Sequence, residues 1–74
     1  MDIDNMVHMA KRIGAFFQAM PDRDEATSGV AEHIHKFWEP RMRRALLSHV
    51  DASQGAGLPP VVMEALAWHR AALA

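Results

Sequence analysis

The chain has 74 residues, enough for one domain spanning residues 1–74, and a formal net charge of −1. Half of its residues are apolar and none is cysteine, which excludes disulfides, thiolate-bound zinc and iron–sulfur clusters on this chain. A domain of this size buries only about 60% of the surface of its unfolded chain. We therefore expect a protein partner to cover the surplus apolar surface, either in a larger complex or in a homo-oligomer.

The same composition bears on location and on nucleic-acid binding. No stretch has the unbroken apolar run of a transmembrane helix, and the start Met1-Asp2-Ile3-Asp4 lacks the positive charge and apolar core of a signal peptide. We expect a cytoplasmic protein that does not enter a membrane. The near-neutral net charge argues against a general polyanion binder, which would normally be strongly basic.

The first predicted element is an amphipathic helix from about Asp2 to Met20, with Asp2 or Asp4 as its N-cap. At about 100° per residue, its apolar side chains cover about half of the helix circumference, whereas a surface helix typically needs an arc of roughly 100°. Two interpretations of this wide face remain open. Either the helix packs against two neighbours within the chain, or Met9 and Phe16 face another chain.

A second helix is predicted to begin after Asp22, because Asp22 and Glu25 form a variant of the capping box. Pro40 disfavours the α conformation at Glu39. The second helix is therefore predicted to end near Trp38, and Pro40 is well placed as the first residue of a third helix.

The inward stripe of the third helix reaches Val50, and the small and polar residues 51–57 predict a loop. Pro59 and Pro60 suit the first turn of a last helix, whose apolar stripe runs from Val62 to Leu73. The predicted fold is all-α, a compact bundle of three to four helices.

The histidines raise the question of a metal site. On a helix, His33 and His35 would point about 200° apart, so they cannot share an ion. By contrast, His33, His49 and His69 lie in the apolar stripes of three different helices and could converge on zinc. We disfavour this site, because core-facing histidines usually hydrogen-bond a carbonyl or water and none of the three has a carboxylate at helical spacing on the same face to orient its ring. A histidine metal protein stays open as an alternative, since the sequence does not say whether the three converge.

The residues of the chain carry no recognisable catalytic signature. The serines and threonine lack a nucleophile elbow, and no glycine-rich loop suits a phosphate. We therefore predict no catalytic, cofactor-binding or metal-binding residue on this chain.

The most unusual stretch is residues 37–47, which combines an aromatic pair, a proline and three arginines. The arginines have three interpretations: a solvated helix start, a nucleic-acid contact in which Trp38 stacks on a base, or a protein interface, where Trp and Arg are enriched at hot spots. Positive charge at a helix start is unfavourable, and the near-neutral net charge disfavours nucleic acid. We predict a partner-binding surface formed by Phe37, Trp38, Pro40, Arg41, Arg43, Arg44 and Leu47.

Four runs of residues carry a resemblance to a known family. They are Ile13-Gly14-Ala15-Phe16-Phe17, Met20-Pro21-Asp22-Arg23, Phe37-Trp38-Glu39-Pro40-Arg41-Met42-Arg43-Arg44, and Gly57-Leu58 with Val61-Val62 and Ala65-Leu66. With them, the chain resembles the delta subunit of NAD-dependent, molybdenum-containing formate dehydrogenases over nearly its whole length. The tail from Ala67 onward is less diagnostic.

The resemblance implies a small non-catalytic accessory subunit of a soluble complex that oxidises formate to carbon dioxide and passes electrons to NAD. It implies that molybdenum with its two pterin guanine dinucleotides, the iron–sulfur clusters and FMN belong to larger subunits. This chain would dock on the large molybdenum-bearing subunit and support its assembly or stability. The residues themselves leave open a small helical nucleic-acid-binding regulator and an independent homodimer.

Overall fold

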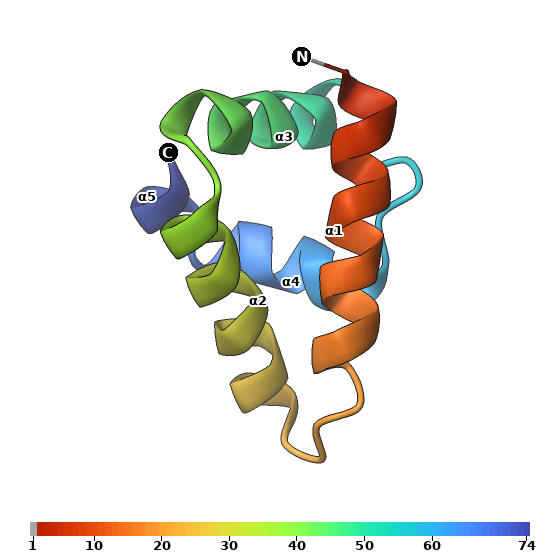
Figure 1. The fold of residues 1–74 in the computed structure, drawn as a ribbon, viewed down its shortest axis with the longest axis vertical. Helices are drawn as coiled ribbons and strands as arrows, with labels where there is room; N and C mark the ends of the chain where they lie inside the picture. The colour runs from red at the N-terminus through yellow and green to blue at the C-terminus, as the bar shows by residue number, and fades with distance from the viewer. Residues whose placement is uncertain (1) are drawn as a thin grey trace.

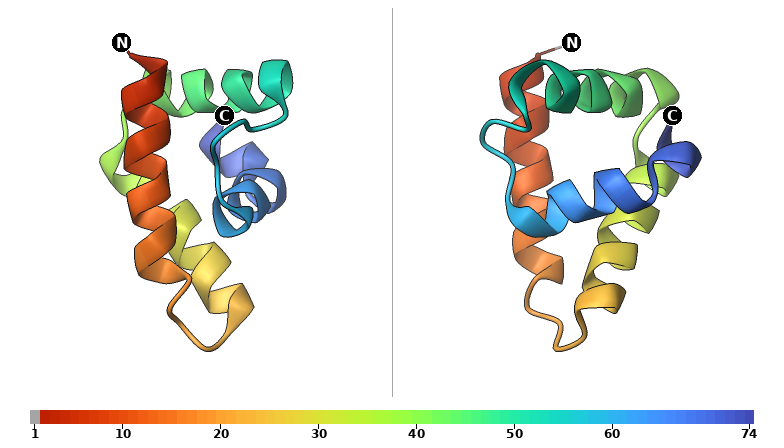
Figure 2. Two further views of the ribbon diagram at one scale, coloured as in Figure 1. Left: turned by 90° about the vertical axis from the view of Figure 1, so that its right-hand side faces the viewer. Right: turned by 180° about the vertical axis from the view of Figure 1, so that it is seen from behind.

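The computed structural model describes residues 2–74, and within that range it contains five α-helices and no strand. They are α1 (Ile3–Phe17), α2 (Arg23–Phe37), α3 (Pro40–Ser53), α4 (Pro60–Trp68) and the single turn α5 (Arg70–Leu73). Helices α1 and α2 form a V, α3 spans its open end, and α4 crosses behind both (Figures 1 and 2). The predicted all-α fold is confirmed. None of the helices in residues 2–74 is long and apolar enough to cross a membrane.

The first two helices begin at the predicted N-caps. The side chain of Asp2 accepts a hydrogen bond from the backbone N–H of Asp4 at 3.0 Å. Asp22 accepts from the N–H groups of Asp24 at 2.8 Å and Glu25 at 3.3 Å. These bonds satisfy first-turn donors that have no partner within a helix. Within residues 2–74, no reciprocal bond joins the Glu25 side chain to the Asp22 N–H, so the predicted capping box is only half formed.

The junction between α2 and α3 follows the prediction made from Pro40. Helix α2 ends at Phe37, and Trp38 and Glu39 are extended, with φ/ψ of −96°/137° and −63°/151°. Pro40 is the first residue of α3, where its missing N–H costs no helical hydrogen bond.

The loop predicted after Val50 is shorter than expected, because α3 continues to Ser53. The helix ends where Gln54 takes a left-handed conformation with φ of 58°. Gly55 and Gly57 follow with φ of 77° and 86°, a region that glycine enters without the steric cost of a Cβ.

The last helix is not continuous, contrary to the prediction. Helix α4 ends at Trp68, and His69, with φ/ψ of −114°/22°, separates it from α5. This break directs the last turn against both α2 and α3. Leu73 is buried there, so the apolar stripe that ran through the predicted helix is still used, but on a redirected segment.

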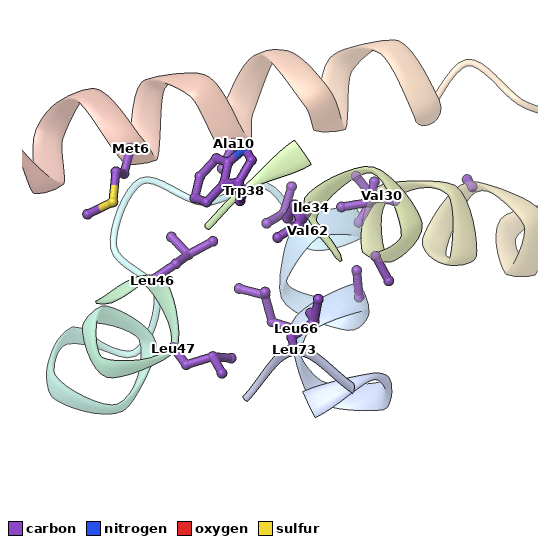
Figure 3. Packing of buried hydrophobic residues seen from close by; sticks show 14 residues of the cluster. Met6, Ala10, Val30, Ile34, Trp38, Leu46, Leu47, Val62, Leu66 and Leu73 are labelled. Atoms are coloured by element: carbon purple, nitrogen blue, oxygen red, sulfur yellow. The ribbon is translucent and has the colours of Figure 1, made fainter. Parts of the chain in front are cut away.

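The core takes apolar side chains from all five helices and from the α2–α3 junction. Its buried members are Met6, Ala10, Ala26, Val30, Ala31, Ile34, Trp38, Leu46, Leu47, Val61, Val62, Ala65, Leu66 and Leu73. Figure 3 shows these side chains converging between α1, α2, α3 and α4. Because every helix contributes, the chain forms one packed unit.

Gly14 allows α1 to pack closely against the start of α4. A Cβ at this position would lie 2.8 Å from Cγ2 of Val62 and 3.0 Å from Cγ of Pro59. Real side chains do not tolerate the shorter distance, so the packing of the two segments requires glycine here.

We predict that Gly14→Ala destabilises the protein. In an exposed helix the same change would stabilise by about 1 kcal/mol, but overpacking a core typically costs 1–3 kcal/mol. We therefore expect a net loss of about 1 kcal/mol, measured by urea unfolding. Ala15→Gly, at the exposed neighbouring position, calibrates the helix propensity of α1. A Gly14→Ala protein more stable than the parent would contradict the close packing of α1 on α4.

Candidate partner-binding surface

Two of the predicted partner-binding residues lie in the core of the chain. Trp38 is 5% exposed and Leu47 is 4% exposed, and in Figure 3 both side chains point into the buried cluster. The expectation that they stand on the surface is wrong. Trp38 belongs to no helix, and its extended backbone turns the indole inward. Leu47 is covered because the buried arc of α3 is wider than the predicted stripe and includes the position after Leu46.

Arg43 is also held inside the chain, where it joins three segments. Its Nη1 donates to the carbonyl oxygens of His35 at 2.9 Å and Trp38 at 3.3 Å, and its Nε donates to the carbonyl oxygen of Leu73 at 3.3 Å. These carbonyls lie at the ends of α2 and α5, where they lack helical partners and where the helix dipole favours a cation. Arg43 is partly buried and makes these internal hydrogen bonds, and its contact with a partner stays a prediction.

The other four predicted residues remain on the surface. Pro40, Arg41 and Arg44 are exposed, and Phe37 is 72% exposed. No hydrogen bond or ion pair holds Arg41 or Arg44 within the part of the chain that the structure describes. These two guanidinium groups are free to pair with carboxylates or phosphates of another molecule.

A row of four rings runs along α1 and α2, and we call Phe16, Phe17, His33 and Phe37 the aromatic row. Neighbouring ring centroids are 5.0 Å apart for Phe16–Phe17, 6.3 Å for Phe17–His33 and 4.8 Å for His33–Phe37. The two inner rings are half-buried, whereas Phe16, at 73%, is as exposed as Phe37. The row is thus anchored at its centre and open to solvent at both ends.

The exposure of Phe16 bears on the two interpretations of the wide face of α1. Met9 packs against the core of the chain, as the intramolecular interpretation requires. Phe16 does not. The intramolecular interpretation is therefore confirmed for Met9. For Phe16, near the C-terminal end of α1, the contact with another chain stays a prediction.

Two hollows open on the aromatic row. One has a volume of about 450 Å³ and is lined by Arg12, Ile13, Phe16, Phe17 and His33. The other has a volume of about 270 Å³ and is lined by Phe17, Gly29, Glu32, His33, Lys36 and Phe37. A Cβ at Gly29 would lie 2.5 Å from the ring of Phe17, so the glycine allows that ring to lie directly on α2.

The charges beside the row are mostly balanced. Lys36 Nζ lies 2.9 Å from Oε1 of Glu32, one helical turn away, and the hydrogen bond from Lys36 lowers the pKa of the Glu32 carboxyl. Arg12 has no hydrogen bond or ion pair within residues 2–74. It is therefore the one cation lining these hollows whose charge is left without a partner by the described residues.

The three histidines considered for zinc lie in different surroundings. His33 belongs to the aromatic row, and His49 Nε2 donates to the carbonyl oxygen of Ala56 at 2.9 Å. His69 lies at the break between α4 and α5. Among residues 2–74, no group of three His, Cys, Asp or Glu side chains is placed to hold a metal ion.

Comparison with protein families gives an assignment for most of the chain. Residues 5–66 match the family model described as the NADH-dependent formate dehydrogenase delta subunit, FdsD. No curated protein matches the chain, and no solved structure does. The matched range includes the aromatic row and the whole of the α2–α3 junction.

We predict that Arg43→Met destabilises the fold by about 1.5–3 kcal/mol, the usual contribution of hydrogen bonds to a charged group. Arg43→Lys should recover only part of this loss, because an ammonium cannot reproduce the guanidinium fork. Arg44→Met is the matched control and should change stability by less than about 0.5 kcal/mol, since Arg44 is exposed. Urea unfolding measures all three. Equal stabilities for the Arg43 and Arg44 variants would contradict the internal role of Arg43.

Proposed function

The chain belongs to the family of NADH-dependent formate dehydrogenase delta subunits, and from this premise we propose that it is a non-catalytic accessory subunit of such a complex. It binds the large molybdenum-bearing subunit and supports that subunit's assembly or stability. Its working compartment is the cytoplasm. The family match confirms the resemblance of the sequence to the delta-subunit family. The role in assembly or stability is our proposal.

The observation that carries this proposal is the exposure of large aromatic side chains on so small a chain. Phe16, at 73%, and Phe37, at 72%, lie open to solvent at the two ends of the aromatic row. Exposed apolar patches on small proteins commonly mark interaction sites, and aromatic residues are enriched where proteins meet. A subunit that functions while bound to a larger protein would have such a surface.

The residues of this chain do not fit the iron–sulfur clusters of a formate dehydrogenase. Iron–sulfur clusters require cysteine thiolates as ligands, and the sequence contains none. We therefore assign the iron–sulfur clusters to the larger subunits. The resemblance to the delta-subunit family implies the same for FMN, the NAD site and the molybdenum with its two pterin guanine dinucleotides. The contribution of this chain is binding rather than chemistry.

A small helical nucleic-acid-binding regulator was the alternative left open by the sequence. Of the eight Lys and Arg residues, three pair with carboxylates and Arg43 is bound by backbone carbonyls. Together with the net charge of −1, this leaves too little free positive charge for phosphate-driven binding. The protein partner is the better-supported interpretation.

We predict that a complex prepared without this chain assembles in lower yield or loses activity faster on warming. Its activity per bound molybdenum should be unchanged, because no residue of this chain takes part in the chemistry. Formate-dependent NAD reduction, normalised to molybdenum content, measures both quantities, and adding back the purified chain is the control. Unchanged yield and lifetime without the chain would contradict an accessory role. A lower activity per molybdenum would contradict a non-catalytic one.

A further inference from the structure

We propose that the aromatic row is the centre of the surface that docks on the large subunit. It receives an apolar side chain from a partner segment whose neighbouring carboxylate pairs with Arg12. This inference rests on the proposed function, because it identifies the surface and the partner chemistry for the same association.

The shape of the surface suits an inserted side chain. The hollow of about 450 Å³ beside Phe16 lies within the range of about 300–1,000 Å³ found for binding pockets. Its walls are the rings of Phe16, Phe17 and His33 with the side chain of Ile13. Because Phe17 rests on Gly29 and His33 packs between Phe17 and Phe37, the floor is already formed. Little ordering is then needed on binding, which favours affinity.

The charge of the surface decides the chemistry of the partner. Arg12 lines the larger hollow, and no residue in the described part of the chain neutralises it. Covering the row with a purely apolar segment would desolvate this guanidinium without compensation, which is costly. A carboxylate beside the inserted apolar group would instead form a charge-assisted pair with Arg12. Glu32 cannot serve this purpose, because Lys36 already holds it.

The same charge argues against a second copy of this chain as the occupant. A symmetric dimer through the row would bring in two Arg12 side chains, and neither copy would supply a free carboxylate from the row. Like charges juxtaposed in an interface are unfavourable. A different protein with an acidic group avoids this repulsion.

The area of a stable interface indicates that the docking surface is larger than the aromatic row. A stable interface buries about 800 Å² on each partner, and the total accessible surface of the chain is 4553 Å². The docking surface therefore extends beyond four rings. The row would be its desolvated centre, where binding energy is usually concentrated, with more polar neighbours as the rim.

The experiment measures binding of the full-length chain to the purified dehydrogenase complex prepared without it. Phe16→Ala and Phe37→Ala should each weaken binding about tenfold or more, and Arg12→Glu should weaken it further than Arg12→Ala. Trp68→Ala is the matched control, since it removes an exposed aromatic outside the row, and it should bind within about twofold of the parent. All the substituted side chains are exposed, and circular dichroism verifies that each variant is folded.

The outcomes separate the surface from the function. If the parent binds while both phenylalanine variants bind equally well, the docking surface is not the aromatic row, although the proposed function stands. If the parent does not bind at all, the proposed function fails as well. If light scattering shows that the isolated chain is a dimer that Phe37→Ala dissociates, the row is a self-association surface and the inference is overturned.

Discussion

The hydrogen bonds from Arg43 to three backbone carbonyls, together with the burial of Trp38, hold the corner on which the rest of the structure depends. The guanidinium ties the end of α2 to α5, while the indole fills the core beneath the same junction. A corner closed in this way fixes the direction of α3 relative to α2. Trp38 and Arg43, two of the residues that stand out in the sequence, therefore stabilise the fold.

The same junction leaves Phe37, the residue before Trp38, exposed on the surface. Phe37 is the last residue of α2, and the backbone becomes extended at Trp38. Trp38 turns into the core, and Phe37 is left on the outside, where it stacks on His33. The exposed aromatic side chains of the described residues are thus Phe16 and Phe37 along α1 and α2, with Trp68 at the end of α4. Of the aromatic pair that the sequence singled out, Phe37 is exposed and Trp38 is buried.

The fold could largely be predicted from local signals. Asp22 and Pro40 mark helix starts through chemistry that acts within one turn, and both positions are as predicted. The break at His69 and the continuation of α3 to Ser53 could not be predicted, since both depend on packing between elements distant in sequence.

The candidate site was predicted less well, for a related reason. Helical periodicity states which residues share a side of a helix, but Trp38 lies outside any helix, and its direction is set by the junction. The aromatic row requires knowing that α1 lies against α2, so that Phe17 can rest on Gly29. Gly29, which lies within a helical stretch of the sequence, was an available signal, because an isolated glycine in a helix often has a packing reason.

The most direct test of this account is acrylamide quenching of tryptophan fluorescence in the Trp68→Phe protein, in which Trp38 is the sole tryptophan. The same protein unfolded in urea provides the reference for a fully exposed indole. The account predicts that Trp38 in the folded, isolated chain is strongly protected from quenching and that adding the large subunit changes this little. Quenching close to that of the unfolded reference, with protection only after the partner is added, would contradict it.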